Sequence, residues 1–124
     1  MDIESLIRDL ATGTGLSRSR AAAKLGEAGD PAASGALMAA LRDSNATVRS
    51  NAAFALGELG ARQAIDPLIV CLQDPDEWVR KSVAKALGLL KARDAVSALD
   101  KALVDGSELV RKNARRSLEQ IRQS

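Results

Sequence analysis

An aspartate followed six residues later by an arginine is the first arrangement in this sequence that could do chemistry. The stretch DPDEWVRK contains Asp74 and Arg80. It also contains Trp78, the only tryptophan in a chain with one phenylalanine and no tyrosine. A carboxylate beside a cationic side chain can take part in proton transfer, so the pair is a candidate for acid–base chemistry.

The same spacing occurs three times, which argues against a catalytic pair. The copies are 31 residues apart: Asp43 and Arg49, Asp74 and Arg80, and Asp105 and Arg111. A catalytic centre needs one such pair, whereas a repeated structure needs one in every repeat. We predict that each pair forms within its own repeat and bridges to the next repeat. Such exposed ion pairs contribute about 0.2–1 kcal/mol each.

The other reactive residue types are nearly absent. The chain has no histidine, which removes the usual general base at neutral pH and the commonest metal ligand. Cys71 is the only cysteine, so we expect a small buried apolar side chain. The TGTG stretch at 12–15 lacks the Gly-Lys-Ser/Thr of a phosphate-binding loop and is predicted to be a turn. We therefore expect no catalytic residues, no metal and no cofactor.

Composition favours one helical domain. Hydrophobic residues make up 46% of the 124 residues, most of them Ala and Leu, which favour helices. The acidic start MDIESLIRDL does not resemble a signal peptide, and no run of 18 apolar residues occurs, so we expect a cytoplasmic protein. The net charge is only +2, but residues 109–124 hold five basic residues and one acidic residue.

A period of 31 residues runs through the chain. The valine before each of the three arginines recurs with it, and several other positions share the period. They are Leu6, Leu37, Leu68 and Leu99; Leu10, Leu41, Leu72 and Leu103; Leu25, Leu56, Leu87 and Leu118; and Gly26, Gly57 and Gly88, with Glu119 in the fourth place. This pattern predicts a stack of similar units.

Each unit reads as two helices. Residues 62–73 predict a first helix that buries Ala64, Ile65, Leu68 and Leu72. A cap followed by a proline, Asp30-Pro31, marks the start of such a helix most clearly.

Residues 46–59 predict the second helix, which buries Val48, Ala52, Leu56 and Leu59. Its expected caps are Asn45, Asp76 and Ser107 in successive units. Gly57 and Gly88 fall inside these second helices, where glycine is unfavourable, so we expect close packing there.

The unit D-x5-VR-x2-AA-x-ALG-x-LG followed by A-[IV]-x2-L-x3-L-x-D resembles a HEAT repeat of the phycobilisome-lyase type. The resemblance covers nearly the whole chain, in four repeats at about 1–29, 30–60, 61–91 and 92–124 of a single domain. It implies an all-α, right-handed α-solenoid of two-helix repeats, with the first helices on the convex side and the VR-containing helices on the concave side. The first repeat has ATGTGLSRSR in place of the turn and VR, and the last has SLE in place of ALG, as expected of capping repeats.

The variable positions of the second helices give the candidate binding site. In this family the stripe formed by position 47, its equivalents, and positions 50, 51, 54 and 58 lines the concave groove. Both aromatic residues fall in that stripe. The predicted partner-binding residues are Phe54, Trp78, Lys81, Lys85, Leu89, Leu109, Lys112 and Arg116.

Each part of this stripe has a second interpretation. Trp78 could instead fold over the repeat junction and cover the aliphatic part of Lys81 or Arg111. The basic residues could form an ordinary solvated helix face, and this is the favoured interpretation for Arg115 and Arg122. For the stripe residues we expect a positive field that attracts acidic partners.

We therefore predict a non-enzymatic scaffold or adaptor that binds a protein partner, and that partner is expected to be acidic. A module that binds nucleic-acid backbones is the alternative, weakened by a pI near 9 and by the absence of tyrosine for stacking. A subunit similar to the bilin lyases is a further alternative, because the repeat type is shared. We expect no membrane association, and the chain is either a monomer or weakly self-associating.

Overall fold

The computed structural model describes residues 2–124 and is all-helical over that range. Met1, the first residue of the predicted first repeat, lies outside the described residues. The α-helices are α1 (Ile3–Thr12), α2 (Gly15–Ala28), α3 (Ser34–Ala40), α4 (Ala46–Leu59), α5 (Ile65–Cys71), α6 (Glu77–Leu89), α7 (Val96–Ala102) and α8 (Glu108–Arg122). Three 3₁₀ turns precede α3, α5 and α7: η1 (Pro31–Ala33), η2 (Arg62–Ala64) and η3 (Arg93–Ala95).

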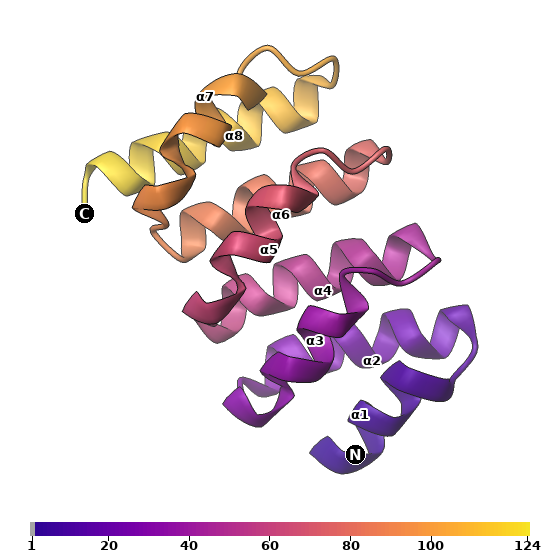
Figure 1. The fold of residues 1–124 in the computed structure, drawn as a ribbon. Coiled ribbons are helices and arrows are strands. Elements are labelled where there is room, and N and C mark those ends of the chain that lie inside the picture. Colours follow the sequence, from indigo (N-terminus) through magenta and orange to yellow (C-terminus); the bar gives the residue numbers. More distant parts are fainter. Residues whose placement is uncertain (1) are drawn as a thin grey trace.

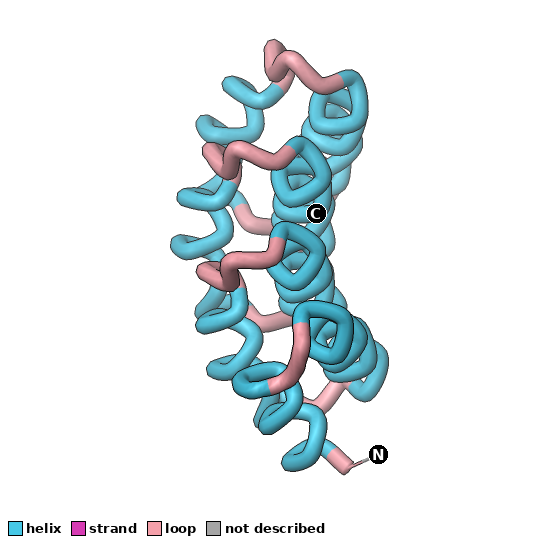
Figure 2. Tube along the Cα trace, turned by 90° about the vertical axis from the view of Figure 1, so that its right-hand side faces the viewer, coloured by secondary structure: helices cyan, strands magenta, loops and turns pink. Residues whose placement is uncertain are grey.

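The helices form two layers. Helices α2, α4, α6 and α8 pack side by side in that order, and the shorter α1, α3, α5 and α7 cover one side of them (Figure 1). Figure 2 shows that the stack is curved, with α2, α4, α6 and α8 on the concave side. We call these four the inner helices and the other four the outer helices.

The first helix of each later pair is shorter than the sequence predicts. The segment 62–73, expected as one helix, is a 3₁₀ turn followed by the seven-residue α5. Pro67 lies in the first turn of α5, where a missing N–H breaks no intrahelical hydrogen bond. Asp30 caps the equivalent segment as predicted, because its side chain accepts a hydrogen bond from the Ala32 N–H at 2.9 Å.

The inner helices begin where their caps predict. Asn45 accepts from the N–H of Thr47 at 2.8 Å, Asp76 accepts from that of Trp78 at 2.8 Å, and Ser107 accepts from that of Val110 at 3.4 Å. Each cap fixes the first turn of a helix that carries candidate site residues.

The core consists of the recurring positions. Ala64, Ile65, Leu68 and Leu72 are buried as predicted, and so are Val48, Ala52 and Leu56. Leu59 is only partly buried, because it lies at the end of α4 and packs against the edge of the core. Leu103 is also more exposed than its equivalents in earlier repeats, since no further repeat covers it in the described chain.

The glycines inside the inner helices allow those helices to approach closely, as predicted. A Cβ on Gly57 would lie 2.8 Å from the Cα of Ala86 on the next inner helix, and one on Gly26 would lie 2.8 Å from the Cβ of Ala55. Gly88 meets Ser117 in the same way. Any side chain at these positions would push neighbouring repeats apart.

Candidate functional site

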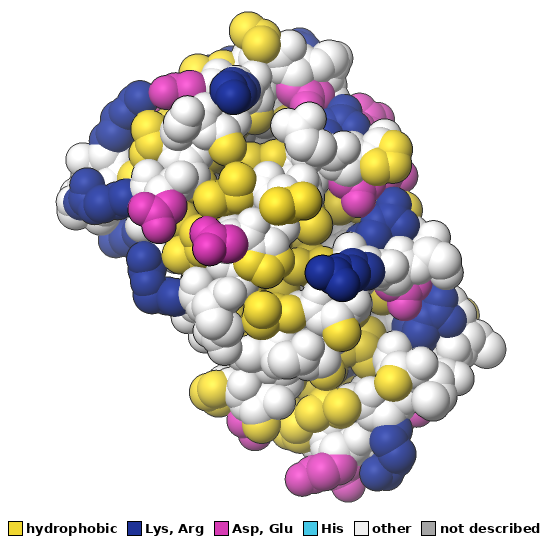
Figure 3. Space-filling model, viewed as in Figure 1, with side chains coloured by type: hydrophobic (Ala, Val, Ile, Leu, Met, Phe, Trp, Pro, Cys, Tyr) yellow, Lys and Arg dark blue, Asp and Glu magenta, His cyan; other side chains and the backbone are white. Residues whose placement is uncertain are grey.

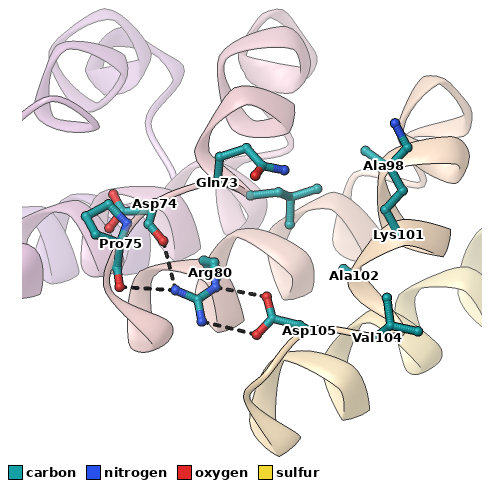
Figure 4. A pocket seen from close by; sticks show the side chains of 10 residues that line it. Gln73, Asp74, Pro75, Arg80, Ala98, Lys101, Ala102, Val104 and Asp105 are labelled. Carbon is teal, nitrogen blue, oxygen red and sulfur yellow. Dashed lines mark hydrogen bonds and ion pairs between the residues drawn. The ribbon is translucent and has the colours of Figure 1, made fainter.

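The repeated acid–base pair bridges two repeats. Arg80 donates through Nε to Oδ2 of Asp105 at 2.9 Å and through Nη2 to Oδ1 at 3.1 Å. Its Nη1 donates to the backbone carbonyl of Asp74 at 2.8 Å (Figure 4). The predicted pairing within a repeat is therefore wrong for the carboxylate: Arg80 contacts the backbone of its own Asp74 and the side chain of the next aspartate. The arginine is long enough to reach the next repeat, and on its own side the turn leaves the carbonyls of Asp74 and Pro75 within reach.

The same geometry occurs at the other junctions. Arg49 pairs with Asp74 at 2.9 Å and Arg18 pairs with Asp43 at 2.8 Å. The sequence reading missed Arg18, although it lies 31 residues before Arg49 and was hidden only because Ser17 replaces the valine. Arg111 holds its Nη1 at 2.7 Å from the Asp105 carbonyl, but no carboxylate lies on its other edge within residues 2–124.

The aspartate side chains of these pairs accept hydrogen bonds from a backbone N–H as well as from an arginine. Asp105 also accepts a hydrogen bond from the N–H of Ser107 at 2.8 Å. The bound Arg80 holds the pKa of Asp105 below its usual value, and Arg18 does the same for Asp43. A carboxylate that is kept charged and fully paired cannot act as a proton shuttle near neutral pH, so these pairs belong to the scaffold.

The eight predicted site residues all lie on the inner helices α4, α6 and α8. We call this set the inner surface: Phe54, Trp78, Lys81, Lys85, Leu89, Leu109, Lys112 and Arg116. Trp78 is 55% exposed and Leu89 is 42% exposed, and Lys85, Lys112 and Arg116 are also exposed. Phe54 and Leu109 are only partly exposed, so Trp78 is the one aromatic side chain that solvent reaches freely.

Trp78 has features of a contact residue and also of a residue that packs over the repeat junction. Its side chain lines a hollow of about 200 Å³ with Ala46, Thr47 and Ser50 of α4, so it lies against the neighbouring repeat. The Nζ of Lys81 lies 5.9 Å from the centre of the indole ring, a cation–π contact. More than half of the residue nevertheless remains open to solvent.

Phe54 and Leu89 lie at the other end of the inner helices. With Lys85 they line a hollow of about 670 Å³ whose floor includes Gly26 and Gly57. The Nζ of Lys85 lies 5.1 Å from the centre of the Phe54 ring.

Several polar members of the predicted stripe face a neighbouring helix instead of the groove. The hydroxyls of Ser50 and Ser82 lie 2.7 Å apart between α4 and α6, and Asn51 donates to the Ser19 carbonyl at 2.9 Å. Asn113 is buried and donates to the carbonyl of Leu109 at 2.8 Å. Asn51 and Ser82 thus face the preceding inner helix, whereas Ser50 faces the following one. Asn113 bonds within its own helix, and periodicity alone did not resolve these directions.

Two acidic residues of the groove were left out of the predicted site. Glu27 and Glu58 line the same hollow as Phe54 and Lys85. The 31-residue period could have identified them, because Glu58 and Glu27 lie one and two repeats before Leu89 at the same position of the repeat. Burial of its carboxylate against Gly26, and then the nearby charge of Glu27, raise the pKa of Glu58.

The convex side has a surface that sequence reading did not single out. Met38, Leu41, Pro67, Val70 and Cys71 line an apolar hollow of about 640 Å³ between α3 and α5. Apolar side chains gather over the outer helices in Figure 3, and Val70 is 72% exposed. Cys71 is half-buried here instead of fully buried, and burial raises the pKa of its thiol, so it stays protonated at neutral pH.

The described residues show neither a metal-ligand cluster nor a membrane-spanning helix. Within residues 2–124 no group of three or more Cys, Asp or Glu side chains is placed to hold a metal ion. Among the helices of the same range, none has the length and apolar character needed to span a membrane.

The chain belongs to the HEAT repeat family, whose sequence pattern matches residues 4–69 and 35–119. Together with the two helical layers, this makes it a right-handed α-solenoid. No curated protein sequence matches the chain.

Solved structures share this fold. Human deoxyhypusine hydroxylase, solved with glycerol, is 26% identical with a TM-score of 0.82, over 99% of this chain and 44% of that one. The complex of CpcE and CpcF of phycocyanin lyase from a Nostoc species is 27% identical with a TM-score of 0.73, over 100% of this chain and 66% of that one. An engineered protein, 23% identical over 98% of this chain and 63% of that one, has a TM-score of 0.79. The chain thus spans less than two thirds of the length of each.

Proposed function

We propose that this chain is a non-enzymatic protein-interaction module of four HEAT repeats that binds an acidic segment of a partner protein across its inner surface. The observation that carries the proposal is Trp78, the only tryptophan, more than half exposed on a helix whose start is fixed by the Asp76 cap. Tryptophan is enriched among the residues that dominate binding energy. A rigid support lowers the entropy lost when the side chain binds.

Charge around Trp78 supports an acidic partner. Lys81 lies over the ring, and Lys85, Lys112 and Arg116 are in the equivalent columns of α6 and α8. None of these four forms an ion pair with a carboxylate within residues 2–124. Their charges are therefore available to a partner, and like charges on one face raise the rate at which an acidic segment associates.

Affinity capture with the purified chain tests this proposal, followed by measurement of the captured protein's affinity. We expect Trp78→Ala and the double variant Lys81→Glu/Lys85→Glu each to weaken binding at least tenfold while remaining folded by circular dichroism. Val70→Ala and Lys101→Glu are matched controls on the outer helices, and both should bind as the unmodified chain does. Unchanged binding by both inner-surface variants would rule out this surface.

A nucleic-acid partner would give a different result. Binding to duplex DNA or RNA would be independent of sequence and would fall steeply with salt, by a factor that grows with the number of phosphates contacted. We expect no such binding at 150 mM salt, since only four basic residues lie on the inner surface. Retention of generic DNA by the unmodified chain and its loss in Lys112→Glu/Arg116→Glu would replace the protein-binding proposal.

A further inference from the structure

The inner surface changes sign along the stack. On α6 and α8 its charged residues are all basic: Lys81, Lys85, Lys112 and Arg116. On α2 and α4 the acidic members of the same columns are Glu27 and Glu58, and Arg20 is the one basic member there. The groove is thus negative near its first repeats and positive near its last ones.

Helix α2 has three basic residues, and they do not cancel this difference. Arg18 is already paired with Asp43. Arg20 and Lys24 occupy columns whose other members, such as Asn113 and Ser117, are buried against the preceding repeat. In the first repeat there is no preceding repeat in the described chain, so these side chains lie on the end of the stack. They act as a polar cap on that end and are separate from the groove.

The acidic end of the groove has fewer cations than carboxylates. Glu27 and Glu58 line one hollow with a single ammonium group, that of Lys85, which lies over the Phe54 ring. Neither glutamate forms an ion pair within 4.0 Å or a side-chain hydrogen bond in residues 2–124. Two carboxylates beside one ammonium leave a local charge that a second cation would neutralise.

The hollow also has the shape of a site for a long basic side chain. Phe54 and Leu89 contribute apolar side chains to its lining, and Glu27 and Glu58 contribute carboxylates. The methylene stem of a lysine or arginine can pack on such walls while its charged end reaches the carboxylates. An aromatic ring beside the cation adds a favourable contact.

The repeat spacing fixes how far apart the charges of a partner must be. Neighbouring helices pack with axes about 8–10 Å apart, so α4 and α8 are separated by roughly 20 Å along the groove. An extended peptide covers about 3.3 Å per residue, and about six residues therefore span that distance. Helix α6, with Trp78 near its start and Leu89 at its end, lies between α4 and α8.

We infer that the partner segment is an extended peptide with charges of both signs: a lysine or arginine that binds between Glu27, Glu58 and Phe54, an apolar residue, and acidic residues about six positions from the basic one that bind Lys112 and Arg116. This inference rests on the proposed function and adds to it the basic residue and the spacing. A purely acidic segment would place its own charges against Glu27 and Glu58, where like charges repel.

Three synthetic 11-residue peptides test the inference, with the single Trp78 as the fluorescent reporter at 50 mM salt. All three have leucine at position 6, glutamate at positions 9 and 10, and alanine or serine elsewhere; position 3 is arginine, glutamine or glutamate. We expect the arginine peptide to bind about three to ten times more tightly than the glutamine peptide, and the glutamate peptide to bind most weakly. An arginine peptide with its glutamates moved to positions 4 and 5 should lose this advantage.

Charge reversal on the protein provides the decisive control. In Glu58→Lys the order should invert, so that the glutamate peptide binds most tightly. Glu27→Lys, at an exposed residue, gives the same test if Glu58→Lys fails to fold. Glu119→Lys, at an exposed residue in the last turn of α8, is the matched control. It should leave the order of the three peptide affinities unchanged.

The outcomes separate the inference from the proposed function. Equal binding of all three peptides, or tightest binding of the glutamate peptide to the unmodified chain, overturns the inference, and the acidic-partner proposal survives if Lys112→Glu/Arg116→Glu then abolishes binding. An unchanged order in both Glu58→Lys and Glu27→Lys also overturns the inference alone. Failure of every peptide to bind overturns both.

Discussion

Helix α6 has one face whose residues repeat along the chain and another whose residues vary. On its buried side, Val79, Leu87 and Gly88 repeat with the period of the chain. On the face toward the groove, Trp78 and Leu89 differ from their equivalents in every other repeat and are exposed. Repetition thus marks residues that hold neighbouring repeats together, and variation marks residues that the stack does not need.

The largest difference between the faces is expected from two leucines on α6. Leu87→Ala removes a side chain with 0% exposure and should lower the free energy of unfolding by about 2–5 kcal/mol. Leu89→Ala removes one that is 42% exposed and should cost less than about 1 kcal/mol. Urea denaturation of both variants measures this, and equal losses would show that the groove face also holds the stack together.

A pair of glycines sharpens the same comparison. Gly57→Ala places a Cβ 2.8 Å from the Ala86 backbone, so we expect a loss of about 1–3 kcal/mol from overpacking. Gly35→Ala on the outer helix α3 meets nothing within 4 Å and should stabilise the chain by up to about 1 kcal/mol, because alanine favours the helix. Thermal denaturation should therefore move in opposite directions for the two variants.

The repeated arginines contain their own control. Arg80→Ala removes a two-bond pair with Asp105 and should cost about 1–2 kcal/mol. Arg111→Ala removes the same side chain and the same backbone contact, but no carboxylate pair. We expect a clearly smaller loss for Arg111→Ala, and equal losses would assign the effect to the carbonyl contact.

The smallest expected effect concerns pH, and a repeated aspartate of the scaffold and a variable glutamate of the groove should respond with opposite signs. The pKa of Asp105 is lowered in the folded chain, so its stabilisation is present above the unfolded value of about 3.9 and is lost as the pH falls through the folded pKa. The pKa of Glu58 is raised, so its protonation stabilises the fold, and its charged form at pH 7 is slightly unfavourable. Asp105→Asn should therefore destabilise the chain at pH 7 and Glu58→Gln should slightly stabilise it.

Both differences should disappear in acid. The Glu58→Gln difference should shrink as the pH falls toward about 4.3, the usual value for glutamate, and the Asp105→Asn difference should persist to lower pH. Chemical denaturation at pH 7, 5 and 3 measures both. A stabilising difference for Asp105→Asn at pH 7 would contradict the role assigned to the arginine pairs.

The sequence predicted more of the scaffold than of the candidate site. Fold class, helix caps, buried leucines and the close-packed glycines followed from a 31-residue period, because each repeat meets the same neighbours and keeps the same residues. The Arg18 pair also followed from that period, and was missed because the comparison required a valine beside the arginine. The short outer helices did not follow, since a 3₁₀ turn and an α-helical turn share much the same apolar spacing.

By itself the sequence determined the solenoid, the ends of its inner helices and the columns that vary, because these depend on contacts repeated at a fixed interval. Only the tertiary structure decided what the variable columns face. It turned Ser82 toward the preceding inner helix and buried Asn113. It also left Trp78 half open and brought Glu27 and Glu58 into one hollow with Phe54. The physical reason is that curvature and helix spacing set the distances between repeats, and these distances are absent from any single repeat.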